Sequence, residues 1–126
     1  MTEKELGTIG ESVAAEYLEE KGYRILERNF TACGGEIDVI AEKGDTLVFV
    51  EVKTRRSGNG AIAAIDERKL KRMLKCADRY LYEKELCGTE KRFRFDAVEV
   101  YTDGNARDAS NTRIRHIENL DVDLIR

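Results

Sequence analysis

Two carboxylates and a lysine form the clearest candidate for catalytic chemistry in the sequence. Asp38 is followed, after a hairpin-sized gap, by Glu51 and Lys53 with one valine between them. Carboxylate oxygens are ligands that Mg²⁺ and Mn²⁺ prefer, and one or two carboxylates commonly hold such an ion while water and phosphate complete its shell. A lysine two residues beyond a ligand on one strand face can reach a substrate phosphate or the attacking water. The three residues therefore predict metal-dependent phosphodiester hydrolysis.

The segments that carry these residues have the pattern of a β-hairpin. Residues 36–42 and 46–53 are rich in β-branched and aromatic side chains, and Gly44-Asp45 between them suits a two-residue turn. This turn sets a register in which Asp38 lies opposite Glu51. The same register predicts one wholly apolar side of the hairpin, made by Ile37, Val39, Ala41, Val48, Val50 and Val52.

Opposed carboxylates destabilise a hairpin unless a positive charge compensates them. At an effective dielectric near 20, two unit charges about 4 Å apart repel by roughly 4 kcal/mol, which is a large part of the stability of a small domain. A divalent cation held by Asp38 and Glu51 offsets that repulsion. The alternative is a surface ion-pair ladder in which Glu36 pairs with Lys53 and one carboxylate is protonated or solvated. Apolar side chains on both faces of these strands are typical of the sheet interior and favour the metal site.

Glu11 is a candidate third acidic residue of the site. It lies in the first predicted helix, which spans Thr8 to about Lys21 and ends before Gly22. Helical spacing places Glu11 on a strip of alanines that can approach a sheet closely. An equally weighted alternative is a capping box, in which the Glu11 carboxylate of Thr8-x-x-Glu11 only accepts a backbone N–H at the helix start.

Basic residues on the second predicted helix and just beyond the hairpin are candidates for nucleic-acid binding. The helix, Asp66 to Leu86, carries four cations on the side opposite its apolar stripe, and they are Arg68, Arg72, Lys75 and Arg79. Lys69 is expected nearer the sheet. Residues 54–60 are predicted to form a mobile loop in which Arg55 and Arg56 would clamp a phosphate backbone. The alternatives are a solvated helix face and an ordinary exposed connection.

The remaining segments complete an α/β domain. Residues 23–30 are a predicted strand, 92–101 a strand parallel to the one that ends at Lys53, and 112–118 an edge strand. The predicted architecture is a mixed sheet with packed helices, in the order αβββαββ, forming one domain over residues 1–126. Asp96 is expected to pair with a nearby cation rather than to support the site.

Composition excludes several classes of protein. Charged residues make up 37% of the chain, and no apolar run approaches the roughly 18 residues of a membrane span. The N-terminus lacks the apolar segment of a secretory signal, so we expect a cytoplasmic protein. Three cysteines without a Cys-x-x-Cys spacing argue against a disulfide framework or zinc knuckle. His116, the one histidine, excludes catalysis that needs two. The net charge of −3 argues against a general nucleic-acid coat, although cations concentrate in residues 53–79.

Asp38 with Glu51-Val52-Lys53 resembles the Asp…(Asp/Glu)-x-Lys signature of restriction-endonuclease-like nucleases. A longer set of segments resembles the YraN family, and it comprises Gly10-Glu11, Gly22 to Leu26, Asn29-Phe30, Gly35 to Asp38, Phe49 to Arg55 and Arg94-Phe95-Asp96. YraN proteins are small bacterial proteins regarded as endonuclease-like and similar in fold to archaeal Holliday-junction resolvases. The resemblance implies this fold, a site role for Glu11, and a branched or otherwise structured DNA substrate. It implies activity by analogy, because one fold hosts many functions. Resolvase-like enzymes act on symmetric junctions as dimers, so a homodimer is one expected state, although no seam in the sequence marks an interface.

Together these features predict hydrolysis of DNA with Mg²⁺ or Mn²⁺ as cofactor. Asp38 and Glu51 would hold the metal, Lys53 would orient water or stabilise charge on the phosphate, and Glu11 would position a second metal or water. A non-catalytic nucleic-acid-binding protein on the same fold is the alternative function, although few aromatic residues flank the cations to stack on single strands. A protein-interaction module with structural ion pairs is a third.

Overall fold

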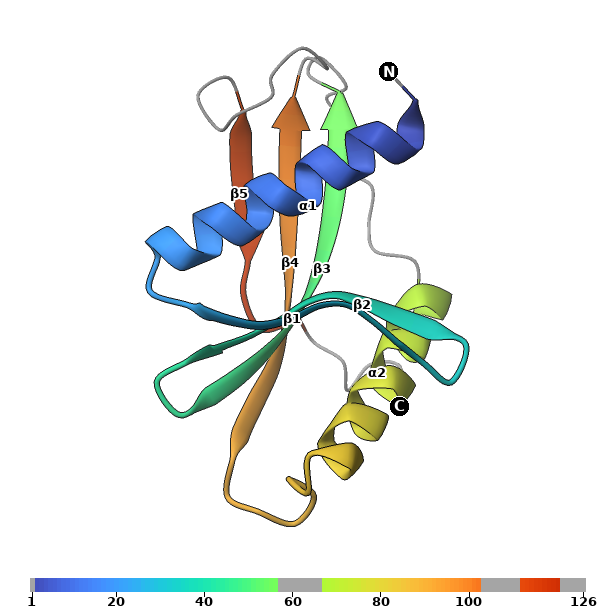
Figure 1. Ribbon diagram of the computed structural model, residues 1–126, viewed down its shortest axis with the longest axis vertical. Helices are drawn as coiled ribbons and strands as arrows, with labels where there is room; N and C mark the ends of the chain where they lie inside the picture. The colour runs from blue at the N-terminus through green and yellow to red at the C-terminus, as the bar shows by residue number, and fades with distance from the viewer. Residues whose placement is uncertain (1, 57–66, 103–111, 121–126) are drawn as a thin grey trace.

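Two helices and five strands follow one another in the order that the sequence predicts (Figure 1). The computed structural model describes residues 2–56, 67–102 and 112–120. The elements are α1 (Glu3–Glu20), β1 (Arg24–Ala32), β2 (Gly35–Lys43), β3 (Thr46–Arg56), α2 (Glu67–Glu83), β4 (Arg92–Thr102) and β5 (Arg113–Ile117). Neither described helix is both long enough and apolar enough to cross a bilayer.

The strands form one mixed sheet in the order β1-β2-β3-β4-β5. Strands β3 and β4 are parallel along their whole length, from Thr46 beside Arg92 to Arg56 beside Thr102, whereas the other neighbours are antiparallel. The predicted parallel pair and the predicted edge strand are therefore confirmed. Parallel neighbours need a long connection between them, and α2 lies in that connection.

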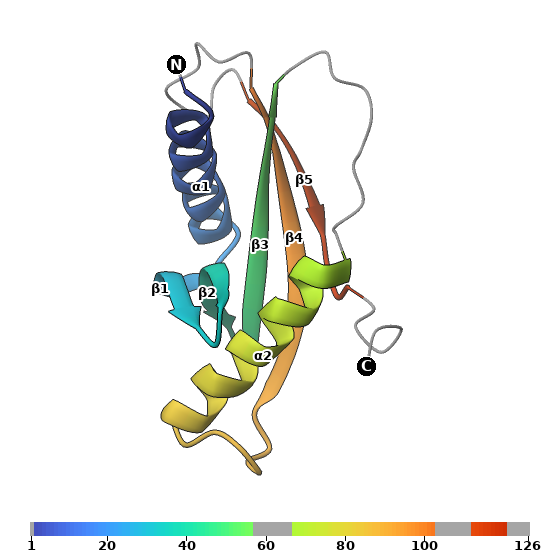
Figure 2. The same ribbon diagram turned by 90° about the vertical axis from the view of Figure 1, so that its right-hand side faces the viewer.

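The helices cover opposite faces of the sheet, because alternate residues of β3 pack against different helices. Leu47 and Phe49 belong to the apolar cluster that contains the buried residues of α2. Val48 and Val50 belong to the cluster that contains α1 residues such as Leu18. Figure 2 shows α1 to the left of β3 and α2 in front of the lower part of β3 and β4. The central strand is thus buried on both sides, as its sequence predicts.

The β2–β3 hairpin has the predicted register near its turn and departs from it farther away. Paired residues run from Lys43 beside Thr46 to Val39 beside Val50. Ile37 then packs into the α2 cluster instead of the apolar side it was expected to share with Val39. The Asp38 carboxylate accepts a hydrogen bond from Val52 N (2.8 Å). In a regular ladder a backbone carbonyl of β2 would accept this bond. The prediction of a regular ladder at this end of the hairpin is wrong. Strand β2 pairs with β3 only over Val39 to Lys43, and Asp38 lies beyond the last paired residue.

Several further predicted boundaries change, among them the end of α2, at Glu83 rather than Leu86, and the end of β1, at Ala32 rather than residue 30. Helix α1 begins at Glu3 rather than Thr8, and its first turn buries Leu6. The predicted mobile loop over 54–60 is wrong for Thr54, Arg55 and Arg56, which extend β3 beside β4. The rest of that loop lies outside the described residues.

Candidate active site

Helix α1 lies across β3 (Figure 1), and Gly10 of the helix is in close contact with the Thr54 side chain of that strand. A Cβ atom built on Gly10 would lie 1.8 Å from Thr54 Oγ1 and 2.8 Å from Thr54 Cβ, so no larger residue fits without movement of the helix. The next residue along the helix is Glu11. The glycine therefore allows α1 to bring the Glu11 carboxylate down to the sheet.

Glu11 has no role in capping the helix. The N-cap is Thr2, whose hydroxyl oxygen accepts a hydrogen bond from Glu5 N (3.1 Å). Thr8 lies inside the helix, and its hydroxyl donates to Lys4 O (3.0 Å). The capping-box alternative for Glu11 is therefore wrong, because the Thr-x-x-Glu pattern at the start of the helix is Thr2 with Glu5.

Three carboxylates from α1 and β2 meet at one place. One oxygen from each of Glu11, Glu36 and Asp38 lies within 4.8 Å of the others. Burial, followed by the negative charge of Glu51, raises the pKa of Asp38 from 3.8 to about 7. Burial also raises the pKa of Glu11, with further contributions from Asp38 and Glu36. The cluster holds unfavourable electrostatic energy that a bound cation would relieve.

Glu36 is the member of this cluster that the sequence did not identify. A regular ladder would have placed it opposite Lys53 as a salt bridge. Because β2 is no longer paired with β3 beyond Val39, the Glu36 carboxylate instead lies with those of Glu11 and Asp38. The sequence signal was only its position two residues before Asp38 on the same strand, which alternation places on the same face.

Glu51 is a fully buried carboxylate on β3, with 0% exposure. Neither of its oxygens has a well-oriented hydrogen-bond donor among the residues that the structure describes. Lys69 Nζ of α2 nevertheless contacts Oε1, and Lys53 Nζ lies 3.5 Å from the same atom. Burial opposes ionisation of Lys69, but the contact with Glu51 outweighs it and raises the lysine pKa. Charge compensation without good hydrogen bonding leaves Oε2 available to another ligand.

The donor set fits a hard divalent cation. All candidate ligands are carboxylates, which Mg²⁺ and Mn²⁺ prefer, and neither histidine nor cysteine is among them. The hydrogen bond from Val52 N fixes the orientation of Asp38 through Oδ2. Oε2 of buried Glu51 has no hydrogen-bond donor among the described residues, and a cation would provide its missing partner.

The predicted nucleic-acid contacts are distributed over two elements. Arg55 lies on β3, two residues beyond Lys53 on the same strand face, and its Nε is buried without a hydrogen-bond acceptor among the described residues. The side chain of Arg56 lies outside the described residues. The helix cations are all exposed on α2, and they are Arg68, Arg72, Lys75 and Arg79. Lys69 turns toward the sheet, as predicted.

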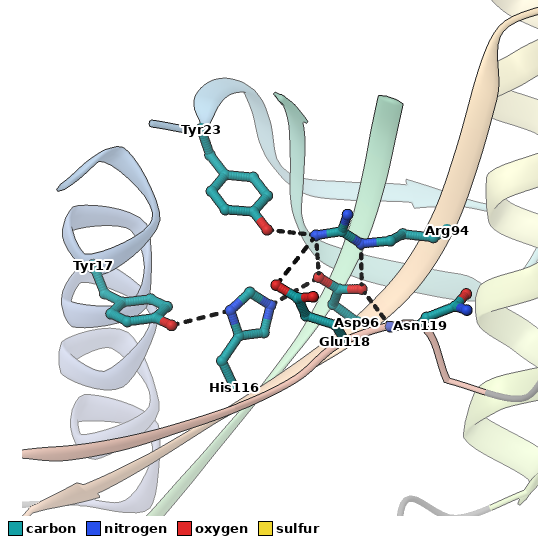
Figure 3. Close-up of polar contacts among 7 residues, drawn as sticks. All are labelled: Tyr17, Tyr23, Arg94, Asp96, His116, Glu118 and Asn119. Atoms are coloured by element: carbon teal, nitrogen blue, oxygen red, sulfur yellow. Dashed lines mark hydrogen bonds and ion pairs between the residues drawn. The ribbon is translucent and has the colours of Figure 1, made fainter. Parts of the chain in front are cut away.

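Asp96 belongs to a separate polar network that joins α1 to β4 and β5 (Figure 3). Its buried carboxylate accepts hydrogen bonds from Arg94 Nε (3.0 Å), His116 Nε2 (2.8 Å) and Asn119 N (2.9 Å). Burial opposes its ionisation, but these donors outweigh that effect and lower the pKa of Asp96. Since the carboxylate only accepts, His116 Nε2 donates to Asp96, and His116 Nδ1 is hydrogen-bonded to Tyr17 OH (3.1 Å). The expected pairing of Asp96 with a cation is confirmed.

Relatives of similar length match this chain closely. A family model described as "Uncharacterised protein family UPF0102" matches residues 10–100. The UPF0102 protein of Caldanaerobacter subterraneus subsp. tengcongensis is 40% identical over 121 residues, covering 94% of this chain and 96% of the relative. That of Persephonella marina is 42% identical over 120 residues, covering 93% and 94%. That of Syntrophus aciditrophicus is 47% identical over 100 residues, covering 78% and 79%.

Solved structures share a more distant likeness in shape. The EndoMS-dsDNA2 complex aligns with a TM-score of 0.42 at 22% identity, covering 69% of this chain and 34% of the other. Pyrococcus furiosus SfsA in complex with Ca²⁺ aligns with a TM-score of 0.38 at 18% identity, covering 85% and 59%. Because the family model spans most of the chain and the relatives cover it nearly end to end, this chain belongs to the UPF0102 family, the YraN family that its motifs resemble.

Proposed function

We propose that this protein is a divalent-metal-dependent nuclease that hydrolyses phosphodiester bonds in DNA. The observation that carries the proposal is the Glu51 carboxylate, which is fully buried and has no well-oriented hydrogen-bond donor among the described residues. Lys69 contacts only Oε1, so the buried Oε2 has no hydrogen-bond partner among the described residues, which is destabilising unless a ligand completes it. The cluster of Glu11, Glu36 and Asp38 adds further oxygen ligands.

Each residue of the site has a proposed role. Asp38 and Glu51 hold the metal, with Glu36 beside them, and Glu11 positions a water molecule or a second ion. Bound Mg²⁺ or Mn²⁺ would supply Lewis-acid polarisation of the phosphate and an activated water. Val52 N keeps the Asp38 carboxylate in a fixed orientation, which lowers the reorganisation that ligand binding requires.

Two lysines provide the positive charge of the site. Lys53 is partly exposed, and its ammonium lies near Glu51, so it can contact a phosphate that enters from solvent. Lys69 compensates Glu51 from the α2 side. A bound metal ion would supply part of that compensation, and the Lys69 ammonium could then contact the phosphate as well. Preorganised cations beside a reacting phosphate stabilise the charge that develops in the transition state.

The test measures metal binding and cleavage with the same proteins. Mn²⁺ affinity is measured by calorimetry, and cleavage is measured on duplex, single-stranded, flap and four-way-junction DNA with Mg²⁺ or Mn²⁺. We expect Asp38→Asn and Glu51→Gln to weaken Mn²⁺ binding by at least roughly 100-fold and to abolish cleavage. Lys53→Met should abolish cleavage while it leaves Mn²⁺ affinity within a few-fold. The matched control is Asp45→Asn, which changes an exposed carboxylate in the same hairpin.

The alternative, a non-catalytic nucleic-acid-binding protein, makes the opposite predictions. It requires no metal, so wild type would cut no DNA in the panel. Asp38→Asn and Glu51→Gln would also bind DNA as wild type does. Those two results together would exclude the nuclease.

A further inference from the structure

A hollow between α2 and the β1–β2 turn opens beside the acidic cluster. It encloses about 320 Å³ and is lined by Thr31, Gly34, Gly35, Glu36, Lys69 and Arg72. The turn and helix are in close contact, because a Cβ atom on Gly35 would lie 2.7 Å from Arg72 O. The hollow thus has a carboxylate of the acidic cluster on one wall and two cations of α2 on the other.

A second hollow follows along the same helix. It is a shallow, open depression of about 380 Å³ lined by Cys33, Lys75, Asp78, Arg79 and Tyr82. Cys33 and Gly34 are neighbours in the turn, so both hollows lie between that turn and α2, and Figure 2 shows the β1–β2 hairpin beside α2. We call the two together the α2 groove. From Lys69 to Tyr82 it runs about 20 Å along the helix axis, which is the length of up to about six stacked nucleotides.

Tyr82 is the aromatic residue of this groove, and its exposure is unusual. It is 66% exposed, more than Phe93 or Leu26, the other exposed large apolar residues in the described part of the chain. The Arg79 guanidinium lies 5.5 Å from the centre of its ring, while Arg79 Nε donates to Glu83 (2.9 Å). An exposed ring beside a cation offers a base a stacking surface and a phosphate an ion-pair partner.

The charges of the groove favour a polyanion over other occupants. Lys69, Arg72, Lys75 and Arg79 line it, against Glu36 at the metal-site end and Asp78 in the second hollow. The bases of a duplex are stacked on one another and present no free face to Tyr82. A single strand presents both a phosphate backbone and open base faces, which are the two groups that this surface can bind.

We propose that the α2 groove binds single-stranded DNA, with phosphates at Arg72 and Lys75 and a base stacked on Tyr82. The binding does not require catalysis. The consequence for the substrate rests on the proposed nuclease function. If a single strand leaves the metal site through this groove, the substrate is DNA with a junction between duplex and single strand. Few aromatic residues flank the cations in the sequence, but Tyr82, three residues after Arg79 on α2, lines the end of the groove.

The test measures binding in EDTA, where a failure of catalysis has no effect. A fluorescently labelled oligo-dT of about 10 nucleotides and a blunt duplex are titrated by anisotropy at several salt concentrations. Tyr82→Ala should weaken oligo-dT binding by about tenfold with an unchanged salt slope, and Tyr82→Phe should bind as wild type does. Arg72→Ala should lower the salt slope by about 0.7. Lys71→Ala is the matched control, because it removes an exposed cation of α2 that does not line the groove.

Three results would overturn the proposal. Tyr82→Ala could bind oligo-dT as tightly as wild type, Lys71→Ala could weaken binding as much as Arg72→Ala, or a polyglutamate peptide could compete as well as oligo-dT. Each would identify a surface that attracts charge without recognising a strand. Asp38→Asn keeps the groove and should retain oligo-dT binding, so loss of cleavage in that variant leaves the groove proposal intact.

Discussion

Gly10→Ala tests the contact that brings Glu11 to the acidic cluster. Gly7 and Gly10 both lie within α1, so each Gly→Ala change gains about 1 kcal/mol of helix propensity. Nothing lies within 4 Å of a Cβ atom on Gly7. Gly7→Ala should therefore raise the free energy of unfolding by up to about 1 kcal/mol, and it is the matched control.

At Gly10 the added methyl group meets a strand of the sheet. The nearest atoms are Thr54 Oγ1 at 1.8 Å, Cβ at 2.8 Å and Cγ2 at 2.9 Å. Thr54 lies in β3, which is paired with β4 at this position, so the helix must move instead. Overpacking of this kind typically costs about 1–3 kcal/mol, and the short distances place it at the upper end. After the gain in propensity, we expect a net loss of about 2 kcal/mol.

A second substitution identifies the clashing atoms. Thr54→Ala removes Oγ1 and Cγ2 but keeps Cβ, so it should relieve part of the overlap. The double variant should therefore be more stable than the sum of the single effects by about 1 kcal/mol. Thr54→Ser keeps the hydroxyl oxygen and should give less relief.

Urea unfolding followed by circular dichroism in EDTA measures all of these variants. A change in midpoint at constant slope reports stability alone. Mn²⁺ titration of folded Gly10→Ala should show weaker binding, since movement of α1 carries Glu11 away from Glu36 and Asp38. If Gly10→Ala is as stable as Gly7→Ala, then α1 does not lie this close to β3, and the placement of Glu11 in the cluster is refuted.

Three further predictions concern the buried charges. In EDTA, folded Asp38 keeps its proton up to about pH 7 whereas the unfolded chain loses it near 3.8, so its contribution to stability is lost as pH rises through that interval. Urea midpoints of wild type and Asp38→Asn should diverge over the interval and run parallel above it, and parallel curves throughout would contradict the raised pKa. Lys69→Met leaves buried Glu51 with less compensation and should cost about 3 kcal/mol in EDTA. Mn²⁺ should raise the melting temperature of this variant more than that of wild type. An equal rise would show that Lys69 does not compensate the charge of the metal site. Asp96→Asn should cost about 3 kcal/mol, because Arg94 and His116 lose their buried charged partner and Arg94 keeps only the exposed, more distant Glu118 carboxylate. Its Mn²⁺ affinity should be unchanged, and a large loss of affinity would show that the Asp96 network reaches the metal site.

The sequence by itself determined the elements and their order, because periodicity and turn chemistry act over short distances. The apolar stripe of α2 and the register of the β2–β3 hairpin near Gly44 follow from such local patterns. The start of α1 was within reach too: Leu6, Gly10 and Val13 continue the buried helical stripe toward the N-terminus. The chain contains two Thr-x-x-Glu patterns, however, and burial of Leu6 decides between them.

Only the tertiary structure decided which charges meet. Glu36 was expected to pair with Lys53. Because β2 and β3 are not paired at this end of the hairpin, Glu36 lies in the acidic cluster instead. Packing of α2 on the sheet brought Lys69 to Glu51. These contacts join residues from different elements, and their geometry depends on the bend of a strand and the closeness of a helix. Local sequence patterns set the periodicity of each element, whereas distances between elements follow from packing of the whole core.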